Sequence, residues 1–452
     1  MQMLHRCVLV LTACALTACN LDLRNPNQPN DTEVVTNTDG VIALGTGLQA
    51  RFALSSFNFA YAAGLVTDEF AATSAALISI SEAEQGNVPP GTGIADNVFN
   101  SLYRTVRTAD DLLAGSDKVA SSLEPGTRSG LRALALTLKA EALGEAVQSY
   151  QRAPVFTDTV ATPVYESRAV VLILVRSLLD SAVATLVAQP VSTIFTSRIL
   201  TPGLNLPNYI QLLRARYARM AGDDAVALSA SNLVGRSGPA AFSLFTYPST
   251  LNVNPFSVVT GGTNGIGVRR QFRNSMLPQD RRFAFFVDST TSLTGRIGAA
   301  ISSFSTRFST PSSTQPVFFP DEALLIKAEA LANQGSLAAS QAVLDSVRTD
   351  CVGGRGLDDP KACLPALAAG QTQAQLLAEI YVQRRYELFG TGLRWEDVRR
   401  RSAIRGPVAA PLVPVDGQRC WLPYAIGDRN ANAANVPADP AEPAAFPAGC
   451  PL

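Results

Sequence analysis

Residues 321–348 read Asp321-Glu-Ala-Leu-Leu-Ile-Lys-Ala-Glu-Ala-Leu-Ala-Asn-Gln-Gly335, then Ser336-Leu-Ala-Ala-Ser-Gln-Ala-Val-Leu-Asp-Ser-Val-Arg348. Apolar residues recur at helical spacing on both sides of Gly335. Glycine readily adopts the positive φ that a tight turn needs, and the small alanines let two helices approach closely. The run therefore predicts two antiparallel helices, near 321–334 and 337–349.

A second run has the same layout. It reads Tyr209-Ile-Gln-Leu-Leu-Arg-Ala-Arg216, turns at Gly222-Asp223 and continues through Ala225, Ala227 and Ala230. It predicts helices near 206–221 and 223–235. Both hairpins resemble tetratricopeptide repeats. A single hairpin cannot bury its apolar face, so several are expected to stack. Ordinary helical hairpins without repeat ancestry are the alternative.

The rest of the chain predicts a mostly α protein whose tetratricopeptide-like hairpins form an α-α superhelix. Helical periodicity recurs near 94–113, 131–150, 168–188 and 373–389, whereas Ser, Thr, Gly, Pro and Phe dominate 236–320. The expected organisation is a helical repeat-like region over 41–235 with an irregular segment near 66–93, an inserted irregular, short-strand subdomain over 236–320, C-terminal repeat helices over 321–402, and a Pro-rich wrapping tail over 403–452.

The N-terminus has the layout of a secretory signal. His5 and Arg6 precede a short apolar stretch, which is far below the ~20 residues of a membrane-spanning helix. The lipobox pattern of bacterial lipoproteins, Leu-x-Ala-Cys, ends at Cys14 and again at Cys19. Cleavage before Cys14 would leave too short an apolar core. We therefore expect a signal peptide over 1–18, a lipid on Cys19 and a polar tether over 19–40, with the protein held at the outer membrane and facing the cell surface.

Four cysteines remain after the lipidated one. An even number in an exported protein indicates two disulfides, with three possible connectivities. The pairs Cys351–Cys363 and Cys420–Cys450 are favoured because each closes a short Pro/Gly-rich loop. A four-cysteine zinc site is the competing interpretation, but the chain has no Cys-x-x-Cys pair.

The sequence lacks the residues that several classes of catalytic and binding site require. The one histidine, His5, lies in the signal, so the mature chain has none for a catalytic triad or a histidine zinc site. No phosphate-binding Gly-x-x-x-x-Gly-Lys loop is present, and the formal net charge of zero gives no indication of nucleic-acid binding. We expect a binding protein without cofactor or metal. A glycosidase would need only two convergent carboxylates, which a sequence cannot show.

Motifs at both ends resemble the SusD/RagB family of outer-membrane nutrient-uptake lipoproteins. The start, Cys19-Asn-Leu-Asp-Leu-Arg-Asn-Pro-Asn27, resembles the family's opening, and residues 321–348 resemble its late repeat helices. The most specific match is Arg384-Arg-Tyr-Glu-Leu-Phe-Gly-Thr-Gly-Leu-Arg-Trp-Glu-Asp-Val-Arg399, and Leu422-Pro423 resembles the closing motif. The sequence departs from the family at Gly390, usually a large apolar residue, and at Thr391, usually Glu.

The motif itself is interpreted as structural. The run from Arg394 to Asp397 is typical of a helix start or a corner, in which Trp395 supplies a large buried face and Arg394 pairs with Glu387 or Asp397. A ligand platform at Trp395 is the functional alternative.

The resemblance implies a protein that binds nutrient oligomers, glycan or peptide, and delivers them to a TonB-dependent outer-membrane barrel. Aromatic faces beside polar groups suit such ligands. The candidate ligand-binding residues are Tyr61, Asp68, Glu69, Phe70, Tyr247 and Phe304. The alternative for the aromatic residues that precede Asp68, such as Tyr61, is that they form part of a helix core. Two other functions remain open: a tetratricopeptide-like scaffold for protein assembly in the envelope, and a helical polysaccharide-degrading enzyme.

The lipobox assignment predicts that Cys19→Ala abolishes labelling by a palmitate analogue and frees the protein from membranes without detergent, because the Cys19 thiol carries the lipid. Cys14→Ala is the matched control and should label normally. Loss of label in Cys14→Ala alone would place the lipid at the first lipobox instead.

Overall fold

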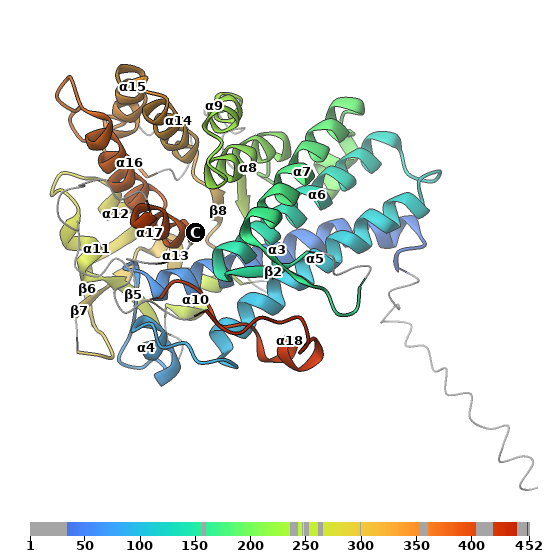
Figure 1. Ribbon diagram of the computed structural model, residues 1–452, viewed down its shortest axis with the longest axis horizontal. Coiled ribbons are helices and arrows are strands. Elements are labelled where there is room, and N and C mark those ends of the chain that lie inside the picture. The colour runs from blue at the N-terminus through green and yellow to red at the C-terminus, as the bar shows by residue number, and fades with distance from the viewer. Residues whose placement is uncertain are drawn as a thin grey trace, which may run out of the picture.

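Helix α3, Thr38–Val66, runs through the middle of the computed structural model (Figure 1). The structure describes residues 34–155, 160–235, 243–245, 247, 253–260, 265–298, 300–351, 360–403, 419–440 and 450. The predicted signal, the lipid site at Cys19 and most of the predicted tether lie outside the described residues. α3 begins where the Asn37 side chain accepts a hydrogen bond from the Gly40 amide. Its last two turns are buried on nearly all sides, whereas Ala43, Ala50 and Leu54 lie exposed on one face earlier in the helix.

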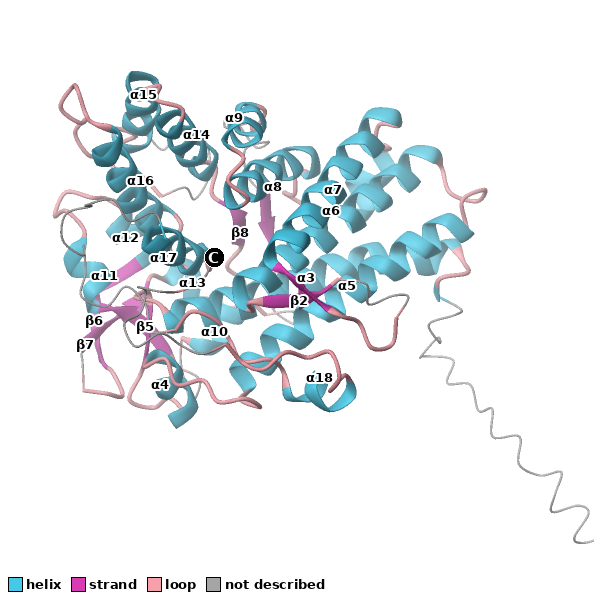
Figure 2. Cartoon of the chain, in the orientation of Figure 1, coloured by secondary structure: helices cyan, strands magenta, loops and turns pink. Residues whose placement is uncertain are grey.

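The long helices follow one another in a stack, each packed on the next (Figures 1 and 2). This confirms the predicted mostly helical fold class. Side-chain caps define several starts: Glu124 caps α6, Asn205 caps α8, and Thr372 with Gln375 forms a capping box on α16. The stack comprises α5 Gly93–Lys118, α6 Pro125–Ser149, α7 Arg168–Ala188, α8 Leu206–Met220, α9 Asp224–Asn232, α14 Asp321–Asn333, α15 Leu337–Arg348, α16 Gln373–Glu387 and α17 Leu393–Ala403.

The two hairpins form as their alanine patterns predict. Gly222 and Gly335, at the turns, have φ of 76° and 77°, and Asp223 caps α9 through the Val226 amide. The hairpins also pack on each other, because alanines of α8 and α9 meet α14 in one apolar cluster. This cluster comprises Ala215, Ala218, Ala227, Ala230, Ile326 and Ala330.

The two irregular regions join in one antiparallel sheet of order β1-β5-β7-β6. β1, Phe70–Ala72, comes from the first region, whereas β5 Ile266–Arg269, β6 Val287–Thr294 and β7 Ala300–Phe304 come from the second. Phe70 lies opposite Val268 in the register. Two two-stranded sheets complete the described strands: β2 Arg152–Pro154 with β3 Tyr165–Ser167, and β4 Ser243–Phe245 with β8 Gln315–Phe318.

Short helices fill the irregular regions and the tail. They are α4 Ile78–Glu84, the π-helix η1 Phe195–Ile199, α10 Pro255–Val259, α11 Arg270–Ser275, α12 Arg282–Phe286, α13 Thr306–Ser309 and α18 Ile426–Ala431. The main hydrophobic core runs through α3, α5, α6, the strands of the second region and the tail at Leu422. The 236–320 segment therefore shares a core with the helices.

Both favoured disulfides are present in the structure. Cys351 pairs with Cys363 and Cys420 with Cys450, which excludes the four-cysteine zinc site. The second bridge lies beside Trp421, and the Leu422 amide donates to the carbonyl of Ser149 at the end of α6. The described part of the tail is thus attached to the helical stack.

Among the described residues, α7 is the one helix with the length and apolar composition of a membrane span. Its inner face packs against α6 and α8. Arg176 pairs with Asp223, and Asp180 pairs with Arg214 of α8. The charged residues of α7 therefore take part in the helical packing.

Candidate ligand-binding site

The predicted residues Asp68 and Glu69 lie in the interior, beneath the corner between α16 and α17. Asp68 is fully buried, and its carboxylate forms ion pairs with Arg385 at 2.5 Å and Arg394 at 2.8 Å. Burial alone would raise the pKa of Asp68, but the two guanidiniums outweigh it and hold the pKa below its usual range. Asp68 is therefore occupied in holding the corner to the end of α3.

Glu69 is also fully buried, but its pKa shifts in the opposite direction to that of Asp68. Burial, reinforced by the charge of Asp68, raises the pKa of Glu69 to about 8. Its backbone carbonyl accepts a hydrogen bond from the Arg269 amide, which brings β5 alongside. Glu69 is mostly protonated at neutral pH and faces no solvent, so neither acidic residue offers a charge to an incoming ligand in this conformation.

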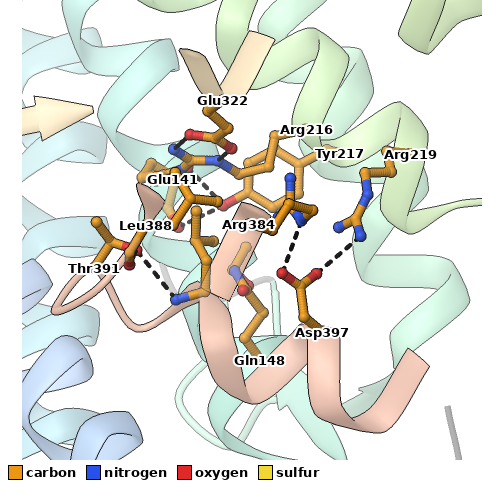
Figure 3. A network of polar contacts seen from close by, with 12 residues as sticks. Glu141, Gln148, Arg216, Tyr217, Arg219, Glu322, Arg384, Leu388, Thr391 and Asp397 are labelled. Atoms are coloured by element: carbon orange, nitrogen blue, oxygen red, sulfur yellow. Dashed lines mark hydrogen bonds and ion pairs between the residues drawn. The ribbon is translucent and has the colours of Figure 1, made fainter. Parts of the chain in front are cut away.

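Further buried ion pairs extend from the same corner (Figure 3). Asp397 accepts hydrogen bonds from Arg384 at 2.7 Å and from Arg219 of α8 at 2.8 Å. Glu396 pairs with Arg168, at the start of α7. The expected partner of Arg394, Glu387 or Asp397, is therefore corrected to Asp68, because Asp397 is held by two other arginines.

A separate buried group lies between α6, α8 and α14. Arg216 reaches Glu322 at 2.7 Å and Glu141 at 2.5 Å, and Tyr217 donates to Glu141 (Figure 3). These residues tie neighbouring helices together. Trp395 is 0% exposed and stacks beneath Arg399, as the structural interpretation of the motif predicts, so a ligand platform at Trp395 is excluded in this conformation.

The predicted aromatic residues divide between the core and a cavity wall. Phe70 and Phe304 are buried, with ring centroids 5.4 Å apart. Tyr61 is half-buried and stacks on Phe57, with ring centroids 5.8 Å apart. Tyr247 is buried and lines a cavity. The structure thus brings Phe70 and Phe304 together in the core, and it does not gather the six candidates at one surface.

An open groove of about 310 Å³ lies instead between α3, η1 and β4. π-Helices are rare and are found frequently at functional sites. Gln49 fastens η1 to α3: its Nε2 donates to the Gly45 and Ile199 carbonyls, and its Oε1 accepts from the Thr201 amide. The amide of Gln49 thus uses its donors and its acceptor in hydrogen bonds that hold one wall of the groove in place.

The groove combines polar groups with one aromatic face. Phe245 is half-buried and packs on Phe52, with ring centroids 5.7 Å apart. Arg198 is exposed and forms no ion pair with a described residue. Thr46, Ser197 and Thr201 add hydroxyl groups along the walls. An aromatic face, a cation and several hydroxyls suit a hydroxyl-rich ligand such as a sugar.

Sequence reasoning missed this groove. Its residues come from three short segments that carry no motif, and Phe245 is one of many phenylalanines in its region. The π-helix has no sequence pattern that would have singled out Arg198.

Among the described residues, no cluster of three or more His, Cys, Asp or Glu could hold a metal ion.

The buried corner predicts that Asp68→Ala lowers stability by about 3–5 kcal/mol, because Arg385 and Arg394 would remain buried without their carboxylate. Asp117→Ala is the matched control. Asp117 pairs with two arginines at the surface, where its side chain is 55% exposed, and should cost under about 1 kcal/mol. Urea denaturation of both variants measures the difference, and equal midpoints would contradict the role given to Asp68.

Comparisons with known proteins agree with the motifs and the fold. The SusD family model matches residues 313–416. No curated protein matches the sequence. Similar solved structures include a SusD homolog from Bacteroides thetaiotaomicron, with 14% identity, a TM-score of 0.67, and coverage of 91% of this chain and 99% of that one.

Two further structures are comparably similar. NanU of B. fragilis has 13% identity and a TM-score of 0.65 over 92% of this chain and 99% of its own. A candidate sugar-binding protein from Bacteroides vulgatus has 15% identity and a TM-score of 0.64 over 89% and 98%. Residues 313–416 therefore belong to the SusD family by sequence, and the chain has the SusD fold, which confirms the resemblance to the SusD/RagB family.

Proposed function

We propose that this protein is a lipid-anchored cell-surface protein that binds glycan oligomers and passes them to a TonB-dependent outer-membrane barrel. The observation that carries the proposal is the groove between α3, η1 and β4. It is open, and it presents Phe245, Arg198 and several hydroxyls together. Membership of the family and a structural relative regarded as sugar-binding favour a glycan over a peptide.

Delivery follows from the proposed anchor. A lipid on Cys19 would hold the protein at the membrane surface, and residues 20–33 can span at most about 50 Å when fully extended. The captured oligomer would then need a channel supplied by another protein. A tether of this length keeps such a channel at high effective concentration.

A scaffold function is the second candidate, and one observation favours it. An apolar groove of about 330 Å³ lies between the end of α7 and the start of α8, lined by Val183, Leu186, Val191 and Ile210 among others. Val187 at its edge is 78% exposed. Apolar surface of this kind can receive a segment of another protein.

The glycan-binding proposal predicts that the soluble mature protein binds members of a glycan array and not of a peptide array. Phe245→Ala and Arg198→Ala should each weaken binding about tenfold, or about 1.4 kcal/mol, because stacking and hydrogen bonds to sugar hydroxyls are lost. Arg107→Ala, on the exposed face of α5, is the control and should bind normally.

Calorimetry on the variants measures the change in affinity. Binding of peptides alone, or unchanged glycan affinity in both groove variants, would count against the proposal. Release of reducing ends from a bound glycan would instead identify a polysaccharide-degrading enzyme.

The delivery proposal predicts that a tag on this protein recovers a TonB-dependent barrel from membranes dissolved in mild detergent, in near-equal amount. The Cys19→Ala form, which lacks the anchor, should recover much less. If cross-linking in intact cells yields no barrel and the tagged protein is purified alone, the scaffold function becomes the better explanation.

A further inference from the structure

A cavity of about 60 Å³ lies behind Phe245, between α3, the β4–β8 pair and the turn that joins α16 to α17. Seven of its sixteen lining residues are aromatic, among them Phe57, Tyr247, Phe256 and Phe308. The cavity shares Ala53 and Phe245 with the open groove, so the two spaces are neighbours. A ligand in the groove could place one substituent past Phe245.

One polar side chain in the cavity wall has an unused donor. Gln315 is 6% exposed, and its Nε2 forms no hydrogen bond with a described residue. A buried donor left in this state costs about 1–3 kcal/mol, so a partner is expected for it. Ser56 also lines the cavity, and its hydroxyl interacts with the buried Glu145 side chain. Gln315 is therefore the group that a ligand acceptor could satisfy.

The turn opposite is built from small residues. Gly390 and Thr391, the two positions at which the sequence departs from the family motif, both line the cavity. A Cβ on Gly390 would approach only the Phe70 ring, at 3.8 Å, and the Thr391 hydroxyl is turned to the Leu388 carbonyl at 2.6 Å (Figure 3). This turn therefore leaves space that larger side chains would reduce.

We propose that the cavity receives an acetyl substituent of a glycan bound in the groove, an inference that rests on the proposed function. A volume of about 60 Å³ holds roughly four water-sized groups, which admits an acetyl group and excludes a sugar ring. The methyl group would pack against the aromatic side chains of the wall. The carbonyl oxygen would accept a hydrogen bond from Gln315 Nε2 once that buried amide turns toward the cavity. A charged substituent is disfavoured, because none of the lining residues is charged and a buried charge without a partner is costly.

The test compares each acetylated glycan that binds on the array with the same glycan after deacetylation, by calorimetry on the soluble mature protein. Penta-N-acetylchitopentaose and cellopentaose provide a neutral pair of glycans, in which the acetamido groups of the first are hydroxyl groups in the second. We expect acetylated glycans to bind at least tenfold more tightly. Gln315→Leu removes the donor and Ala60→Val fills the cavity, so each should reduce that preference below threefold. Gln211→Leu, on α8, is the control and should retain the preference for acetylated glycans.

The outcomes separate this inference from the proposed function. Glycans that bind equally with and without acetyl groups, or only without them, would overturn the acetyl site and leave the glycan-binding function in place. A preference that survives in both cavity variants would overturn the location. Thermal unfolding of each variant establishes that it is folded. No glycan binding at all would overturn the proposed function and this inference with it.

Discussion

Buried pairs of arginine and carboxylate hold this fold together across long distances in the chain. Arg394 reaches Asp68 over a separation of 326 residues, Arg168 reaches Glu396 over 228, and Arg219 reaches Asp397 over 178. A charge taken out of water without a partner costs several kcal/mol. Each of these charges can therefore be buried at low cost only when its own partner element, the end of α3, the start of α7 or the end of α8, meets the α16–α17 corner. This requirement makes the corner the point of assembly for the helical stack.

The corner also determines where the groove and the cavity beside it form. Asp68 is held beneath the corner, and strand β1 begins two residues later. β1 pairs with β5, which brings the 236–320 region against α3. Strand β4 then lies beside α3 through Phe245 and Phe52. The groove and the cavity behind it are consequences of this placement, since both use α3 as one wall.

Much of the architecture could be predicted because its signals are local. Alanine periodicity and turn glycines locate the two hairpins, and short loops indicate the disulfides. α3 was not singled out as a helix, because its exposed face also carries apolar residues, Ala43, Ala50 and Leu54, so the sequence shows no clear apolar stripe. Asp68 and Glu69 beside Phe70 were interpreted as a polar and aromatic ligand surface. A sequence cannot distinguish that arrangement from a buried ion pair whose partner lies in another element.

The corner constrains its residues strictly and the groove does not, which explains why the family could be recognised from the sequence while the candidate groove could not. At the corner, Arg384, Arg394 and Asp397 need particular charges at particular positions, because a wrong side chain would leave a buried charge unpaired. In the groove, Phe245 and Arg198 are at least partly in water, where many combinations of aromatic and polar side chains are tolerated at little cost in stability. Recognisable motifs therefore lie where a substitution is costly to folding, whereas the proposed ligand-binding groove lies where substitutions cost little. The departures at Gly390 and Thr391 lie in the middle of the motif, at the turn between α16 and α17, and they also line the cavity beside the groove. At that position, a change in a structural motif can alter the shape of the proposed binding site.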